Sequence, residues 1–227
     1  MVDRNAGHRT LRLAHRGDFR SARENTLAAL LAGAQLPGCD GVEFDVRVSR
    51  DGEPVLLHDE TLERVQGVGA RPSGLTAAAL AQFAVPRLAD VLAAVPRSAV
   101  LDIDFKEDIG RNGVEILAAG RGPDLSNTFV SSFVPSILRR IHDLAPAWAL
   151  WLNTVELSDA TIAQAVELGC RGISVEWHSV ERRSVRRAAD EGLELASWTV
   201  TRRSTYRRLA ALGLRAIIVE GQALEDW

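Results

Sequence analysis

Two acidic residues and a histidine–aspartate pair stand close together in one stretch of the chain. Residues 41–59 read GVEFDVRVSRDGEPVLLHD. Glu43 and Asp45 are two positions apart in an apolar run with strand character, so their side chains point to the same face. Two buried carboxylates are costly unless a positive charge compensates them, and a hard divalent cation does so. The stretch favours a metal site, although acids facing water on a half-exposed strand usually explain a lone E-x-D pattern.

Two histidines add the capacity to move protons near neutral pH. His15 ends the first strand-like run, and His58 follows the turn at Asp51-Gly52 and is followed by Asp59. Either histidine alone is more often structural. Beside a cluster of acids, the pair favours a general acid and a general base, with the two roles left open between them.

A third acidic strand completes the candidate site. Asp104 lies two residues before Lys106, which is the only lysine among 27 basic residues. Glu43, Asp45 and Asp104 form an oxygen-rich set suited to Mg²⁺ or Ca²⁺, with Asp102 as a second choice for the third ligand. Lys106 and Arg16 supply positive charge for an anionic substrate. Metal, cations and histidines around one point indicate phosphoryl chemistry.

These residues need a scaffold that brings distant strand ends together. Eight β-rich runs alternate with Ala/Leu-rich helical runs, and a short extra strand near residues 55–58 and a Gly-spaced excursion at residues 60–82 follow the second run. Strict alternation predicts a parallel sheet, and the count of eight predicts closure into a (β/α)8 TIM barrel with a short insertion after strand 2. Sites in such barrels lie at the carboxyl ends of the strands, where the candidate residues stand. No linker-like segment divides residues 1–227, so we expect one domain.

Composition narrows the partners and the location. The chain has 227 residues, 46% hydrophobic and 25% charged, with a net charge of −3. This charge gives no reason to expect nucleic acid as the main partner, and no run is long enough to be an integral membrane segment. The start of the chain does not resemble a signal peptide, and Cys39 and Cys170 are expected to be free thiols. We therefore expect a cytoplasmic protein; the sequence leaves its oligomeric state open.

The order and spacing of several short patterns identify a family. They are His15-Arg16-Gly17, Glu24-Asn25-Thr26, Glu43-x-Asp45, Asp51-Gly52, His58-Asp59, Pro86-x-Leu88, Asp104-x-Lys106, Ser131-Ser132-Phe133 and Trp198-Thr199-Val200. Together they resemble the glycerophosphodiester phosphodiesterase family, which consists of phospholipase-C-like (β/α)8 barrels. The likeness covers nearly the whole chain.

The resemblance implies a reaction and a set of roles. The reaction is hydrolysis of a small-molecule glycerophosphodiester to glycerol 3-phosphate and an alcohol. The resemblance also implies that Glu43, Asp45 and Asp104 hold the divalent cation and that His15 and His58 perform the acid and base steps. Arg16 and Lys106 would contact the phosphate, and Phe133 and Trp198 would form apolar walls for the glycerol or the head group.

The chain departs from the family pattern at four positions. Asp104 replaces the usual glutamate, Thr201 replaces the asparagine after Trp-Thr-Val, Val219-Glu220-Gly221 stands in place of a threonine–aspartate pair, and Arg23 replaces a proline. Two alternatives remain: a lysophospholipase-D- or sphingomyelinase-D-like phosphodiesterase, and a non-catalytic phosphodiester-binding barrel.

Glu24 and Asn25 precede a predicted helix and allow two interpretations. A helix cap with a first-turn acid is one. For Glu24, the other is a supporting role behind the metal-binding residues, and the sequence favours neither.

Overall fold

A closed ring of eight parallel strands forms the centre of the computed structural model, which describes residues 9–125 and 127–225. The sheet order is β1-β9-β8-β7-β6-β5-β4-β2, and pairing of β1 with β2 closes the ring. The parallel strands are β1 Leu11–Ala14, β2 Gly41–Val48, β4 Val100–Phe105, β5 Thr128–Ser132, β6 Leu150–Thr154, β7 Gly172–Glu176, β8 Glu194–Val200 and β9 Ala216–Val219. The predicted barrel is confirmed.

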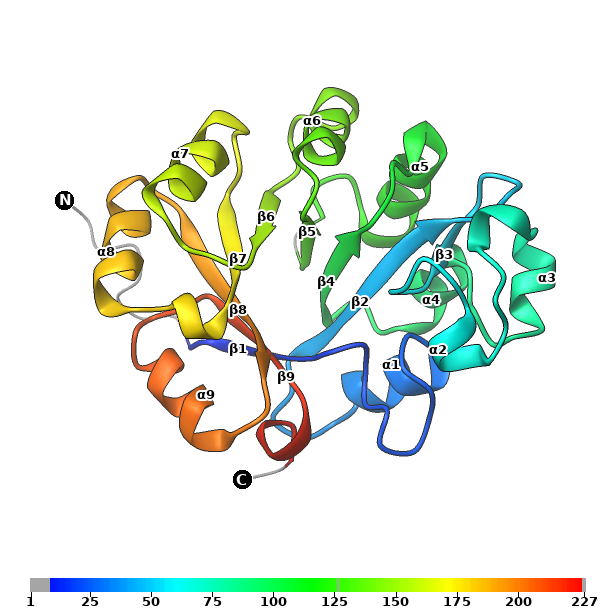
Figure 1. Ribbon diagram of the computed structural model, residues 1–227, viewed down its shortest axis with the longest axis horizontal. Coiled ribbons are helices and arrows are strands. Elements are labelled where there is room, and N and C mark those ends of the chain that lie inside the picture. Colours follow the sequence, from blue (N-terminus) through cyan, green and yellow to red (C-terminus); the bar gives the residue numbers. More distant parts are fainter. Residues whose placement is uncertain (1–8, 126, 226–227) are drawn as a thin grey trace.

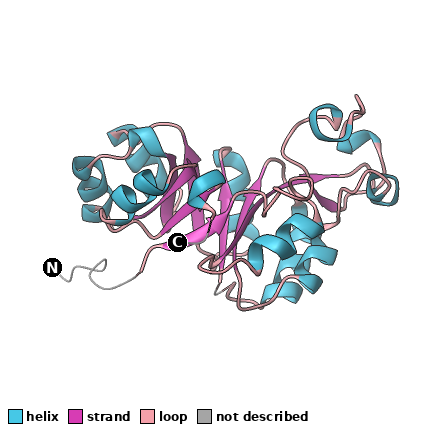
Figure 2. Cartoon of the chain, turned by 90° about the horizontal axis from the view of Figure 1, so that it is seen from below, coloured by secondary structure: helices cyan, strands magenta, loops and turns pink. Residues whose placement is uncertain are grey.

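Helices surround the strands on the outside, as Figures 1 and 2 show. They are α1 Leu27–Ala34, α4 Leu88–Ala94, α5 Gly110–Arg121, α6 Pro135–Leu144, α7 Asp159–Glu167, α8 Arg182–Asp190 and α9 Arg203–Ala210, with short 3₁₀ turns at Trp177–Ser179 and Gly221–Ala223. Their apolar faces pack on the outward-facing strand residues, and this packing forms the largest core cluster. No helix within the described ranges has both the length and the apolar character needed to cross a bilayer.

The predicted insertion after the second parallel strand is also present. Strand β3 (Pro54–Leu56) pairs antiparallel with β2, and helices α2 (Glu63–Gln66) and α3 (Ala77–Ala81) follow it, with a 3₁₀ turn at Pro72–Gly74 between them. This segment has a small apolar core of its own, centred on Leu62 and Leu80. In Figure 1 it stands beside α1 and β2 at one side of the ring.

The inside of the barrel is filled by a second apolar cluster. Leu13, Trp151, Ala196, Ala216 and Ile218 come from β1, β6, β8 and β9 and meet one another within the ring. Such a filled interior is a packed core and not a pore, so a site lies at an end of the barrel. Both cysteines are free, Cys170 buried and Cys39 half-buried, as expected. The cytoplasmic location inferred from them stays a prediction.

Candidate active site

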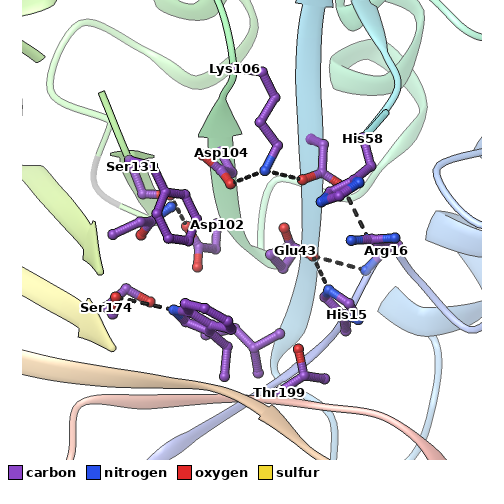
Figure 3. Close-up of a pocket in the computed structure, with 15 residues that line it drawn as sticks. His15, Arg16, Glu43, His58, Asp102, Asp104, Lys106, Ser131, Ser174 and Thr199 are labelled. Carbon is purple, nitrogen blue, oxygen red and sulfur yellow. Dashed lines mark hydrogen bonds and ion pairs between the residues drawn. The ribbon is translucent and has the colours of Figure 1, made fainter. Parts of the chain in front are cut away.

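One pocket of about 150 Å³ opens at the carboxyl ends of the strands. All nine residues singled out in the sequence line it: His15, Arg16, Glu43, Asp45, His58, Asp104, Lys106, Phe133 and Trp198. Figure 3 shows His15, Arg16, Glu43 and His58 on one side of this pocket and Ser131 and Ser174 on the other. The nine residues come from segments up to about 180 residues apart, from His15 to Trp198, and closure of the barrel brings these segments together.

Strand register places the acids side by side. Glu43 pairs with Asp102 and Asp45 pairs with Asp104 across β2 and β4, so the four carboxylates share the inner face. Glu43 is 7%, Asp45 2% and Asp104 5% exposed, which excludes surface acids as their description. The parity argument from the sequence is confirmed.

Asp45 is the most strongly compensated of these acids. Lys106 Nζ lies 2.9 Å from its Oδ1, Arg16 Nε lies 3.2 Å from its Oδ2, and Asn25 Nδ2 donates a 2.8 Å hydrogen bond to Oδ2. Burial alone would raise the pKa of Asp45, but the positive charges of Lys106 and Arg16 outweigh burial and lower this pKa to about 2. Asp45 is therefore charged across the physiological range.

Glu43 and Asp104 are compensated less completely. Burial raises the pKa of Glu43 to about 8, with the Asp45 charge adding to the effect, and burial raises the pKa of Asp104 to about 6 in spite of Lys106. The Asp104 carboxylate forms an ion pair with Lys106 through Oδ2, while its buried Oδ1 has no hydrogen-bond partner among the described groups. An unpartnered carboxylate oxygen in a pocket with excess negative charge is the environment that a hard cation satisfies.

The geometry differs from the expected three-carboxylate cage. Among residues 9–125 and 127–225, no three histidine, cysteine or acidic side chains are gathered closely enough to hold a metal ion. The Lys106 ammonium is an ion-pair partner of both Asp45 and Asp104, and Figure 3 shows its contact with Asp104. The donor chemistry fits Mg²⁺ or Ca²⁺, whereas the side-chain arrangement places a lysine cation between two of the donors.

Each histidine has its Nδ1 held by a carboxylate. Glu220 Oε2 lies 3.1 Å from His15 Nδ1, and Asp59 Oδ1 lies 2.6 Å from His58 Nδ1. These contacts leave Nε2 of both rings for the pocket, and His15 Nε2 lies 3.9 Å from Glu43. Neither supporting role was predicted, although the departure at Glu220 marked its position at the end of a barrel strand.

The two imidazoles differ in the direction in which their pKa is shifted. Burial lowers the pKa of His15, but the hydrogen bond to Glu220 and the charges of Glu43 and Asp45 outweigh it, so the pKa lies above the ordinary value. Burial also lowers the pKa of His58, and there the nearby acids do not compensate. One pocket thus holds two histidines with oppositely shifted pKa values.

The loop after β1 has left-handed backbone at two residues, and a hydrogen bond joins them. Arg16 and Asn25 have φ values of 53° and 55°, and Asn25 N–H donates to the Arg16 carbonyl at 3.1 Å. The Asn25 amide also bonds both the side chain and the backbone N–H of Asp45. Asparagine suits this place because it tolerates left-handed backbone and offers a donor and an acceptor together.

The helix-cap interpretation of Glu24 and Asn25 was wrong. Thr26 is the N-cap of α1 and accepts a hydrogen bond from Ala29 N–H. Glu24 instead accepts a 2.7 Å hydrogen bond from Arg16 Nη1, so it supports Arg16, a residue that lines the pocket. The Asn25 side chain bonds Asp45 and does not cap the helix, so the N-cap is the next residue, Thr26.

Aromatic residues form the opposite wall. The Phe133 and Trp198 rings pack edge to face with centroids 5.5 Å apart, and Trp198 Nε1 donates to the Ser174 carbonyl at 3.1 Å. Phe133 remains 42% exposed at the rim. Sequence reasoning did not include Asn153, Ser174 or Thr199, which also line the pocket. Asn153 and Thr199 stand near the carboxyl ends of β6 and β8, which is the signal that marks them, whereas Ser174 lies in the middle of β7.

The closed (β/α)8 barrel has a pocket at its strand ends, lined by carboxylates, two histidines and two positively charged side chains. This combination is typical of the class of hydrolases that act on anionic esters. Comparison with known proteins specifies the family. Residues 15–221 match the model of the glycerophosphoryl diester phosphodiesterase family. The chain belongs to that family, and it is therefore an enzyme that hydrolyses phosphodiesters of this kind.

Individual relatives agree with this assignment. The chain is 26% identical over 234 residues to the glycerophosphodiester phosphodiesterase of Caldanaerobacter subterraneus subsp. tengcongensis, covering 93% of this chain and 94% of the relative. It is 45% identical over 64 residues to glycerophosphodiester phosphodiesterase 1 of Homo sapiens, covering 28% of this chain and only 19% of that protein. Among solved structures, a phosphodiesterase of Oleispira antarctica in complex with the product sn-glycerol 3-phosphate is similar, with a TM-score of 0.83, 25% identity and 93% of each chain covered.

Proposed function

We propose that the chain hydrolyses glycerophosphodiesters to glycerol 3-phosphate and an alcohol with a divalent cation, Mg²⁺ or Ca²⁺, bound by Glu43, Asp45 and Asp104. The observation that carries the proposal is the shared inner face of these acids, with an unpartnered Asp104 oxygen, in one pocket with both histidines. The product complex of the Oleispira antarctica relative supports a small-molecule substrate of the same kind. When bound, the cation would stabilise negative charge on the phosphate oxygens.

Arg16 and Lys106 are proposed to bind the phosphate. Arg16 is partly engaged with Glu24 and Asp45, and Lys106 with Asp45 and Asp104, so both cations are held in place before substrate arrives. Fixed positive groups stabilise charge on non-bridging oxygens without reorganising during the reaction.

His15 and His58 are proposed to transfer protons through Nε2. Nδ1 of each ring is held by a carboxylate, which fixes the ring and makes Nε2 the reactive atom. One ring would take a proton from the attacking water as its oxygen bonds to phosphorus, and the other would give a proton to the alcohol oxygen as its bond to phosphorus breaks. Phe133 and Trp198 would contact the glycerol or the head group at the rim.

The test is glycerol 3-phosphate release from glycerophosphocholine, measured with EDTA and with added Mg²⁺ or Ca²⁺. We expect metal-dependent release, reduced at least 100-fold by His15→Ala and by His58→Ala, since general acid–base catalysis contributes about 10²–10⁴-fold. His142→Ala is the matched control, because His142 is exposed on the outer helix α6. Release that continues unchanged in EDTA would contradict the metal proposal, and full activity of either pocket variant would contradict its assigned role.

A lysolipid-directed activity is the second candidate. Phe133, Val134 and Val155 are 42%, 41% and 58% exposed and follow β5 and β6 at the pocket end of the barrel. Exposed apolar side chains at a pocket mouth suit an acyl chain. Lysophosphatidylcholine belongs in the same assay, and glycerophosphocholine turnover with no lysolipid turnover would exclude this candidate.

A further inference from the structure

Arg64 joins two parts of the site from outside the pocket. It lies in α2 of the insertion, and its guanidinium contacts two carboxylates that belong to different segments. Nε donates to Asp59 Oδ2 at 2.6 Å, while Nη2 and Nη1 donate to Glu24 Oε1 at 2.6 Å and Oε2 at 3.0 Å. One side chain thus holds an acid from the loop after β1 and an acid from the segment after β3.

Each of these carboxylates in turn holds a pocket residue. Asp59 Oδ1 lies 2.6 Å from His58 Nδ1, and Glu24 Oε1 accepts a 2.7 Å bond from Arg16 Nη1. The same Glu24 oxygen therefore accepts from both Arg16 and Arg64. A single connected network runs from the imidazole through Arg64 to the proposed phosphate-binding arginine.

We propose that Arg64 is a positioning residue that fixes His58 and Arg16 relative to each other, His58 through Asp59 and Arg16 through Glu24. The inference rests on the proposed function, since it assigns proton transfer to the first residue and phosphate binding to the second. The proposal gives the insertion a role in the site, although the Arg64 side chain does not itself line the pocket.

The charge pattern explains why an arginine stands here. Positive and negative groups alternate along the network, and Arg64 stands between the two carboxylates. Without it, Asp59 would retain only His58, and Glu24 would retain only Arg16. Lysine cannot reproduce the arrangement, because one ammonium lacks the planar fork that bonds both oxygens of Glu24 while a third N–H reaches Asp59.

The same insertion contains a matched control. Arg71 forms a 2.9 Å ion pair with Glu60, and the two side chains are 61% and 68% exposed. This pair has the same chemistry and a similar place in the chain, but neither side chain bonds a residue that lines the pocket, whereas Asp59 and Glu24 do. A general loss of insertion stability would be visible in Arg71→Ala as well, whereas loss of positioning would not.

The experiment compares Arg64→Ala, Arg64→Lys and Arg71→Ala in full-length, metal-loaded protein. The rate of glycerophosphocholine hydrolysis gives kcat and KM, and calorimetric titration with glycerol 3-phosphate gives a Kd that does not depend on turnover. Loss of an outer partner typically costs 10–100-fold in activity, so Arg64→Ala should lower kcat about tenfold and raise KM and the product Kd about tenfold. Arg64→Lys should recover part of one effect only, and Arg71→Ala should match the wild type.

Variants of Asp59 and of Glu24 separate the two branches of the network, one that reaches His58 and one that reaches Arg16. Asp59→Asn should lower kcat with KM little changed, and Glu24→Gln should raise KM and the product Kd with kcat little changed. In the Asp59→Asn background, Arg64→Ala should lower kcat no further, because residues in one network are not additive. Circular dichroism and melting temperature identify any variant that fails to fold, in which case Arg64→Lys carries the comparison.

Two results would overturn the inference. The first is wild-type kcat, KM and product Kd in folded Arg64→Ala. The second is equal loss in Arg64→Ala and Arg71→Ala. Failure of the proposed function itself is a separate result, because it would show as absence of turnover in the wild type, while the product Kd of the variants would still report on the Arg16 branch.

Discussion

The pocket histidines depend on carboxylates that do not themselves line the pocket. Asp59 follows His58 directly in the chain, whereas Glu220 reaches His15 across 205 residues. Glu220 follows the last barrel strand and presents its carboxylate to the His15 ring.

Glu220→Ala should lower kcat about tenfold with KM little changed, because the His15 ring loses the partner that orients it. Glu220→Gln should retain more activity, since its amide oxygen can still accept a hydrogen bond from Nδ1. Steady-state kinetics on glycerophosphocholine measures both. Glu225→Gln is the control, as Glu225 pairs with Arg203 at 3.0 Å on the surface. Wild-type kcat in Glu220→Ala would show that His15 needs no such partner.

The loop between β1 and α1 is the element that shapes the pocket most closely. Gly17 has φ 81°, and a Cβ placed on it would lie 2.4 Å from the Ala29 backbone carbon. The start of the helix thus packs directly on the backbone that follows Arg16. Only glycine allows this approach, because any side chain would push the loop away from the helix.

Gly17→Ala should destabilise the protein by about 2–5 kcal/mol, adding steric overlap to the cost of left-handed backbone. Gly52→Ala is the matched comparison: Gly52 has φ 80° in the β2–β3 turn and nothing within 4 Å of its would-be Cβ. It should cost only about 1–2 kcal/mol. Urea unfolding of the two variants measures the difference. Equal losses would mean that the overlap is relieved by a small loop movement.

At the scale of the whole molecule, Arg64 ties the insertion to the barrel through Glu24. Burial would raise the pKa of Glu24 and of Asp59. The bonds and charge of Arg64, together with those of Arg16 at Glu24 and of His58 at Asp59, outweigh burial and hold both pKa values below their usual range. A carboxyl with a lowered folded-state pKa stabilises the fold above its unfolded pKa of about 4, and this stability is lost as pH falls through the folded-state pKa.

The free energy of unfolding should therefore fall as pH drops from about 4.5 toward 2, and the fall should be smaller in Arg64→Ala. Urea unfolding at pH 7, 5 and 3 measures this dependence. Arg71→Ala serves as the control and should keep the wild-type slope. Identical slopes in Arg64→Ala and the wild type would show that the two carboxyls gain nothing from Arg64 in the folded state.

The sequence by itself determined the barrel, the insertion after the second parallel strand and the nine residues that line one pocket. The barrel, the insertion and the charged residues and histidines of the pocket follow from local signals: the alternation of strand and helix patterns, side-chain parity in strands, and the rule that strand ends carry the site. Phe133 and Trp198 came from the resemblance to the family. Glu43 and Asp45 share a face because residues two apart in a strand do so, and Asp104 joins them because the register of β2 and β4 pairs it with Asp45. The roles of these residues remain predictions.

Only the tertiary structure decided which side chains meet. Glu220 reaches His15, Arg64 reaches Glu24, Asn25 turns to Asp45 and not to the helix, and Lys106 lies between two acids. These pairings join segments that are distant in sequence or depend on one side chain choosing between two partners. Such choices are settled by three-dimensional packing and by the balance of buried charge, neither of which is visible in residue spacing.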